Sequence, residues 1–145
     1  MSTDNKIIIE SLDEGIPSPR YAMPGDGGLD CYCTQDMVIA PGEFTFVPLG
    51  IKIQPPEGCI VLVLPKSGLA SKQGFVCTTG LIDNGFRGEV KMMAHNISDK
   101  DIVVTRGQKV CQMLVLKIPF AEVEYGKVDE DTARGESGWG STGLK

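Results

Sequence analysis

Asp83 is the residue whose type and position first indicate chemistry in this sequence. It stands directly before Asn84-Gly85, in the polar stretch 80–90 between two strongly apolar runs. Aspartates near turns commonly hydrogen-bond their own backbone, so a structural role is one explanation. The other explanation is that a carboxylate held on a rigid turn accepts a proton from a reacting water molecule.

A β-hairpin or a close relative of one is predicted around Asp83. The flanking apolar runs 75–77 and 90–94 have the composition of two paired strands. The Asn84-Gly85 pair is suited to a tight two-residue turn, in which both central residues adopt positive φ angles.

A second polar group follows the apolar run 59–64, which predicts a strand buried on both faces. Pro65 would end that strand, and residues 66–72 would form one or two helical turns, the only helix that we predict. The Lys66 ammonium, the Ser67 hydroxyl and the first backbone N–H groups of this helix together suit an anion. An ordinary capped helical turn is the alternative.

Two further polar residues lie within predicted strands. Asp30 follows the glycine-rich segment 24–28, at the mouth of the strand 29–33. Gln112 is an amide within the mostly apolar strand 109–116. A buried amide must find hydrogen-bond partners or face a polar site, so a structural role and a ligand contact are both open.

The C-terminal segment has a different composition from the rest of the chain. From Gly126 onward the apolar pattern stops, which predicts a domain at residues 1–125 and a mobile arm at 126–145. This arm nevertheless contains the only tryptophan, Trp139, which follows Arg134 and is flanked by glycines. An arm that closes over a flat ring and an anion would use Trp and Arg together.

The composition predicts an all-β fold. Among 145 residues there are 18 Gly and 9 Pro, which favour short strands joined by turns. The runs 37–39, 44–47 and 51–53 are typical of a meander of antiparallel strands, and the run 6–10 predicts an edge strand.

The net charge, the apolar runs and the cysteines indicate which binding partners and which cellular compartment to expect for the protein. A net charge of −5 argues against binding to long nucleic acids, which requires a broad positive field. The sequence contains no apolar run long enough to cross a bilayer, which argues against a membrane role. The five cysteines show no CxxC spacing and lie mostly in apolar runs, which predicts a reducing, cytoplasmic compartment.

Five segments of the sequence resemble, in order, the five motifs of the trimeric dUTPases. They are residues 24–33, 65–70, 80–90, 107–112 and 134–143. The resemblance implies a jelly-roll-like (β-clip) barrel and hydrolysis of dUTP to dUMP and pyrophosphate, which keeps uracil out of DNA and supplies dUMP for thymidylate synthesis. It also implies a homotrimer in which motifs one, two and four come from one chain, motif three from a second and the arm from a third.

The resemblance further implies a role for each matching residue. Asp83 would activate the water that attacks the α-phosphorus, and Asp30 would bind the hydration shell of the cofactor, Mg²⁺. Phe86 would lie under the deoxyribose and exclude a 2′-hydroxyl. The phosphates would be held by Lys66, Ser67, Gly68, Gln112 and Arg134. Backbone groups of 77–83, among them Cys77, Gly80, Leu81 and Ile82, would contact the uracil edge together with Lys91. Trp139 would stack on uracil, and Gly135 would also contact the substrate.

The sequence departs from the family pattern at three of these positions and at Ser137. Lys66 stands where the family usually has Arg. An arginine can bind a phosphate through two parallel hydrogen bonds, whereas the lysine ammonium group acts as a single compact charge. Phe86 replaces the usual Tyr and keeps the ring without its hydroxyl. Ser137 stands where a second Gly is usual, and Trp139 where Phe or His is commoner.

Two other functions remain as alternatives. The dCTP deaminases resemble this fold, but the sequence shows neither their deaminating carboxylate nor a donor set for cytosine. The second alternative is a nucleotide-responsive binding protein, in which dUTP orders the segment 134–143 and thereby alters a surface for a partner.

Overall fold

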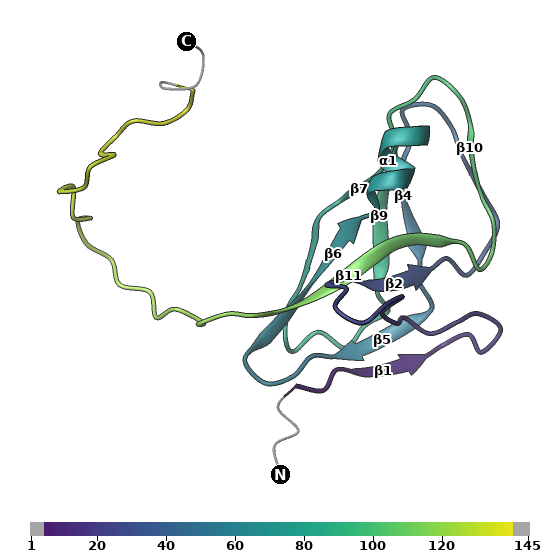
Figure 1. Ribbon diagram of the computed structural model, residues 1–145, viewed down its shortest axis with the longest axis horizontal. Coiled ribbons are helices and arrows are strands. Elements are labelled where there is room, and N and C mark those ends of the chain that lie inside the picture. Colours follow the sequence, from purple (N-terminus) through teal and green to yellow (C-terminus); the bar gives the residue numbers. More distant parts are fainter. Residues whose placement is uncertain (1–4, 141–145) are drawn as a thin grey trace.

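The computed structural model describes residues 5–140, and nearly all of its regular structure is β-strand (Figure 1). The strands are β1 (Ile8–Ser11), β2 (Leu29–Tyr32), β3 (Met37–Ile39), β4 (Phe44–Pro48), β5 (Ile51–Gln54), β6 (Cys59–Pro65), β7 (Phe75–Thr78), β8 (Gly80–Ile82), β9 (Lys91–Asn96), β10 (Ile102–Val104) and β11 (Lys109–Lys117). The single helix in the described range is α1 (Ser67–Gln73). The predicted all-β fold with one short helix is confirmed.

The described strands pair antiparallel in four sheets. The largest has the order β2-β11-β6-β8, and a three-stranded sheet has the order β4-β9-β7. The other two sheets are the pairs β1-β5 and β3-β10. Together they give the jelly-roll-like fold, although the pairings among residues 5–140 do not close a continuous barrel. The two apolar strands β6 and β11 lie in the middle of the largest sheet, and every residue of β6 is buried or half-buried.

Strands β3, β4 and β5 occupy the runs predicted to be strands, but the predicted meander is wrong. Each of the three pairs with a strand far away in the sequence, and none pairs with its sequence neighbour. Gly42 and Gly50 have positive φ angles between these strands, where the chain turns toward another sheet. An alternating pattern fixes the buried face of a strand, but it does not identify the pairing partner.

The hairpin predicted around Asp83 is confirmed in its pairing and wrong in its turn. β7 and β9 pair antiparallel, with Cys77 opposite Ala94. Neither Asn84 nor Gly85 has a positive φ angle, so the tight two-residue turn is not formed. The reason is that β8 intervenes and pairs with β6 in a different sheet.

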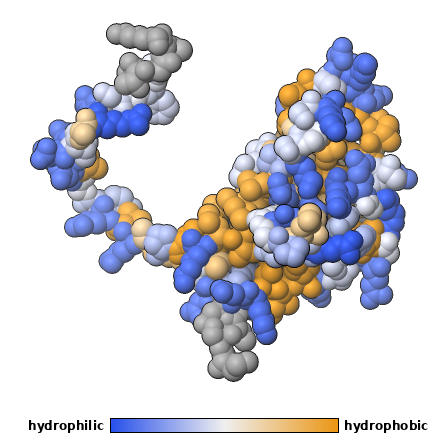
Figure 2. Space-filling view, in the orientation of Figure 1, coloured by the Kyte–Doolittle hydropathy of each residue, from blue (hydrophilic) through white to orange (hydrophobic). Residues whose placement is uncertain are grey.

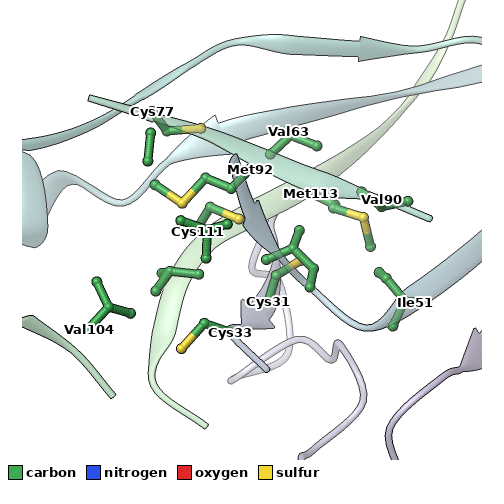
Figure 3. Packing of buried hydrophobic residues seen from close by; sticks show 14 of the residues in the cluster. Cys31, Cys33, Ile51, Val63, Cys77, Val90, Met92, Val104, Cys111 and Met113 are labelled. Atoms are coloured by element: carbon green, nitrogen blue, oxygen red, sulfur yellow. The ribbon is translucent and has the colours of Figure 1, made fainter. Parts of the chain in front are cut away.

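The hydrophobic core is rich in sulfur (Figure 3). Cys31, Cys77 and Cys111 pack there beside Met92 and Met113. All five cysteines are buried and free, as expected for small hydrophobic residues. Burial raises the pKa of the Cys77 thiol to about 11, so this thiol stays protonated and unreactive at neutral pH.

An ion pair ties the loop after β1 to the turn before β11. The Arg106 guanidinium contacts both carboxylate oxygens of Asp13, with Nη2 2.9 Å from Oδ1. Arg106 Nη1 also donates to the carbonyl of Thr34, at 2.6 Å. The hydrogen bond from Arg106 is the main cause that lowers the pKa of Asp13 to about 2.

The C-terminal segment extends away from the body of the molecule (Figure 1). β11 ends at Lys117, and residues 119–137 are exposed and contain neither helix nor strand. The predicted division at residue 126 stays a prediction. Among the described residues, no helix combines the length and the apolar character needed to span a membrane.

Candidate active site

A pocket of about 300 Å³ lies beside the connection between β8 and β9. This volume is within the range of small-molecule sites. Its lining includes six of the predicted site residues, namely Gly80, Leu81, Ile82, Asp83, Phe86 and Lys91. The other lining residues are Phe46, Val63, Glu89, Val90 and Met93. The structure therefore brings the residues predicted for the sugar and the catalytic water into one pocket with some of those predicted for the base.

Asp83 directly follows β8 and is exposed in the pocket wall. Its turn is held by the backbone N–H of Phe86, which donates to the Asp83 carbonyl at 3.1 Å. The Asn84 Nδ2 group donates to the carbonyl oxygens of Pro56 and Cys59, at 2.9 and 2.7 Å. These bonds anchor the turn to the beginning of β6, so the Asp83 carboxylate is carried by a fixed backbone.

Phe86 lies against the backbone of Gly88. A Cβ atom at residue 88 would lie only 2.5 Å from Cζ of the Phe86 ring. Gly88 is therefore needed for the observed position of this ring, a role that the sequence analysis did not assign. A glycine whose importance depends on a neighbouring ring cannot be distinguished by sequence from one that a turn requires.

Cys77 does not line the pocket. Its side chain is buried in the core on β7. The contact with uracil expected for this residue would therefore be made by backbone groups.

A second polar group surrounds Asp30 in β2. Asp30 is 4% exposed, and its Oδ1 contacts Lys66 Nζ while its Oδ2 lies 3.4 Å from Lys109 Nζ. Burial by itself raises the pKa of Asp30, but the hydrogen bonds and charges of the two lysines outweigh burial and hold this pKa below its ordinary value. One buried carboxylate and two ammonium groups give this group a net positive charge.

Gln112 adjoins Asp30 on the neighbouring strand β11. Its Nε2 donates to the carbonyl of Pro65 at 2.9 Å. Gly28 packs closely on the amide, because a Cβ atom there would lie 2.1 Å from Gln112 Oε1. The half-buried amide thus has a structural partner and also lies beside the charged group, so both predicted roles of Gln112 are compatible with its position.

Lys66, Ser67 and Gly68 lie where β6 passes into α1. Lys66 is the N-cap residue, and its side chain makes no capping bond but reaches Asp30. Ser67 and Gly68 are exposed in the first helical turn. The first N–H groups of a helix have no partner within the helix, so this turn can donate to an anion.

Arg134, Gly135 and Trp139 lie on the extended C-terminal segment, away from both groups (Figure 1). Arg134 Nε donates to the carbonyl of Ser137 at 2.8 Å, and the Trp139 side chain is fully exposed. Residues 141–143 of the predicted fifth motif lie outside the described residues.

The pocket and the Asp30 group lie toward opposite ends of β6. Ile82, which precedes Asp83, pairs with Val61, whereas Pro65 ends β6 directly before Lys66. The four steps from Val61 to Pro65 span about 13 Å at about 3.3 Å each. Within one chain, Asp83 is therefore separated from the residues predicted to hold the phosphates.

A metal ion would find one carboxylate in the Asp30 group. Across residues 5–140, no three His, Cys, Asp or Glu side chains form a group able to hold a metal. Asp30 nevertheless fits Mg²⁺, because this ion commonly binds through one or two carboxylates together with substrate phosphates and water. The two lysines beside Asp30 also give the group a positive charge that suits anionic phosphates.

The sequence comparisons agree with the five predicted motifs. The model of the family described as dUTPase matches residues 14–143, which include all five segments. The chain belongs to the dUTPase family. A relative in Hydrogenobaculum sp. (strain Y04AAS1), named deoxyuridine 5'-triphosphate nucleotidohydrolase, is 38% identical over 143 residues, covering 97% of this chain and 99% of the relative.

Solved dUTPase structures have the same fold. A mutant dUTPase of Staphylococcus bacteriophage 80alpha, determined with dUpNHpp, has a TM-score of 0.86 and 22% identity, covering 97% of this chain and 99% of the phage chain. A mutant dUTPase from phage phi11 of S. aureus, described with a structural Mg(II) ion, has a TM-score of 0.81 and 21% identity, covering 87% of this chain and 99% of the phage chain. At these identities the two structures support the dUTPase fold of this chain.

Proposed function

We propose that this dUTPase-family chain hydrolyses dUTP to dUMP and pyrophosphate. The observation that carries the proposal is the pocket in which Asp83 lies with Phe86, Lys91 and the exposed edge of β8. This pocket offers an apolar ring, backbone groups and the carboxylates of Asp83 and Glu89 to a nucleotide. The reaction would keep uracil out of DNA and supply dUMP for thymidylate synthesis.

Asp83 would orient the water that attacks the α-phosphorus and accept its proton. A positioned carboxylate in this role contributes about 10²- to 10⁴-fold to the rate. The anchored turn supports this role, since a base must stay within hydrogen-bond reach of the water throughout the attack. The proton passes to Asp83 as the water oxygen bonds to phosphorus, and pyrophosphate leaves.

The phosphates would be held by the residues around the N-terminus of α1 and by the C-terminal segment. Ser67 and Gly68 would donate hydrogen bonds, while Lys66, Gln112 and Arg134 would contact phosphate oxygens. Phosphoryl transfer depends mainly on positioning and charge stabilisation, so these donors would lower the barrier in addition to Asp83.

We propose Mg²⁺ as the cofactor, with Asp30 holding its hydration shell. When bound, the ion would neutralise negative charge on the phosphate oxygens. The buried Asp30 carboxylate, kept ionised by two lysines, supports this proposal. The phage phi11 structure described with a structural Mg(II) ion adds a family example of magnesium binding.

Base and sugar selection would come from the pocket beside β8. The backbone of 77–83 with Lys91 would match the uracil edge, and an analogue that leaves buried polar groups unpaired can be rejected by about 10⁴ or more. The Phe86 ring would leave no room for a 2′-hydroxyl. Gly135 would let the arm bend, and Trp139 would stack on uracil.

We further propose that each active site is completed by other copies of the chain in a homotrimer. The separation of Asp83 from Ser67 along β6 supports this, since the α-phosphorus must lie close to both. One copy also exposes many large apolar side chains, and Figure 2 shows hydrophobic surface where the C-terminal segment leaves the body. The exposed apolar residues include Val38, Phe44, Phe46 and Val103. The five free cysteines support a reducing, cytoplasmic compartment for the assembly.

The test is pyrophosphate release from dUTP, dTTP, dCTP and UTP, measured with Mg²⁺ and again with excess EDTA. We expect turnover of dUTP alone, and only with Mg²⁺. Ammonia release from dCTP would favour a deaminase. Tight binding of dUTP without pyrophosphate release would favour the nucleotide-responsive binding protein.

A further inference from the structure

The buried carboxylate of Asp30 is shared by two lysines from different elements. Lys66 precedes α1 and contacts Oδ1, while Lys109 begins β11 and lies 3.4 Å from Oδ2. The Lys66 side chain is 31% exposed and the Lys109 side chain 50% exposed, whereas Asp30 is buried. The buried negative charge of Asp30 is therefore neutralised by these two ammonium groups.

A β-bulge places Lys109 on the face of Asp30. Regular alternation along β11 would put Lys109 on the same face as Cys111, in the core, and opposite to Gln112. The register shifts between Lys109 and Cys111, so that Lys109 lies across from Tyr32 instead. Bulges commonly redirect a side chain beside a functional site. This one converts a core position into a contact with Asp30.

The proposed function gives the two lysines different tasks. Lys66 adjoins Ser67 and Gly68, so its ammonium group is needed at the phosphates once a nucleotide binds. Its departure would remove the cation in direct contact with Asp30, and the proposed Mg²⁺ would reach this carboxylate only through its hydration shell, so the buried charge would still need a direct cationic partner. Lys109 is farther along the neighbouring strand and is part of a β-ladder, so it can stay in place.

We propose that Lys109 is a positioning residue that holds the Asp30 carboxylate when Lys66 transfers from Asp30 to the nucleotide phosphates. This inference rests on the proposed function, because it requires a triphosphate beside α1. Lys109 acts through Asp30 and touches no substrate. Without Lys109, Lys66 would remain on Asp30, and the nucleotide would lose a phosphate contact.

The experiment measures the affinity for dUpNHpp with Mg²⁺ by titration calorimetry on the full chain. We expect Lys109→Gln to weaken binding about tenfold and Lys109→Arg to restore it to within about threefold of wild type. Lys117→Gln is the matched control, since it removes the same charge from the other end of β11, and it should bind like wild type. Thermal unfolding of each variant verifies that it folds.

The same substitution in the Asp30→Asn variant shows whether Lys109 acts through Asp30 or has a general electrostatic or structural effect. In the Asp30→Asn background there is no buried charge to compensate, so adding Lys109→Gln should change the affinity by less than about twofold. Equal affinities of wild type and Lys109→Gln would overturn the inference, and so would equal losses in both backgrounds. If wild type itself fails to bind dUpNHpp, the proposed function fails first.

Discussion

Ser67 and Asp83 lie toward opposite ends of the same strand, β6. Ser67 follows the end of β6 after Lys66, whereas Asp83 follows the short strand β8, whose last residue, Ile82, pairs with Val61 near the start of β6. The part of β6 between Val61 and Pro65 alone spans about 13 Å, so the two residues are well separated within one chain. If the proposed sites are shared between chains, the Ser67 and the Asp83 of one site come from different copies.

Mixed assemblies should regain activity that neither parent has. Ser67→Ala and Asp83→Asn should each lower kcat by about 10² or more, since one removes a phosphate donor and the other the base. If the two residues of a site come from different chains, random mixing gives about one quarter of the sites both native residues. Pyrophosphate release after the two variants are unfolded and refolded together measures this recovery. A mixture as inactive as its parents would mean that one chain supplies both residues.

Asp83→Asn should lower kcat by about 10²- to 10⁴-fold and leave the affinity for dUpNHpp nearly unchanged. The amide keeps the size of the side chain but cannot take the proton. Glu89→Gln is the control, because Glu89 is another carboxylate in the lining of the same pocket. It should retain kcat within about fivefold. A large loss in Glu89→Gln with little loss in Asp83→Asn would transfer the role of base to Glu89.

Gly88→Ala should weaken discrimination against UTP. The added methyl group would overlap the Phe86 ring, which must then move from the place where it would exclude a 2′-hydroxyl. We expect the ratio of kcat/KM for dUTP over UTP to fall about tenfold, as loss of a close steric contact typically costs. Gly85→Ala is the matched control, because a Cβ atom there meets nothing within 4 Å and residue 85 has no positive φ angle. An unchanged ratio in Gly88→Ala would show that Phe86 does not select the sugar.

The predicted site residues that the structure brings together are those with a local sequence signature. Asp83 and Phe86 line one pocket, because both belong to a single short segment around one turn. Lys109 was missed because a bulge, which alternation does not reveal, turns it toward Asp30. Gly88 was missed because its role depends on where the Phe86 ring lies.

Strand positions were predictable in the same way, whereas strand partners were not. The apolar runs gave the places of β3, β4 and β5, but their pairing depends on contacts with distant strands. Short loops containing Gly and Pro are compatible both with hairpins and with crossings between sheets. The meander was therefore the simplest pattern and was wrong.

The Asp13–Arg106 ion pair should make stability depend on pH in acid. The pKa of Asp13 is about 2 in the folded protein, below the ordinary value of 3.8, so its contribution is complete above about pH 4 and is lost as the pH falls through 2. Asp13→Asn should lower the unfolding midpoint by a few degrees at most at pH 7, because the pair is partly exposed. The difference from wild type should shrink between pH 4 and pH 2. Glu14→Gln, a neighbouring exposed residue, should show no such trend, and a constant difference for Asp13→Asn would exclude the ion pair as the cause.

Trp139 should report closure of the C-terminal segment over the nucleotide. It is the only tryptophan of the chain and is fully exposed in the structure, so its fluorescence comes from one site in water. Stacking on uracil would remove the indole from water, and we expect quenching together with a shift of the emission maximum when dUpNHpp and Mg²⁺ are added. Trp139→Phe keeps a stacking ring and should lower affinity by less than about fivefold, whereas Trp139→Ala should lower it about tenfold or more. If nucleotide binding detected by calorimetry leaves the emission of wild type unchanged, the indole does not close over the base, and the contacts proposed for Arg134 on the same segment lose their support.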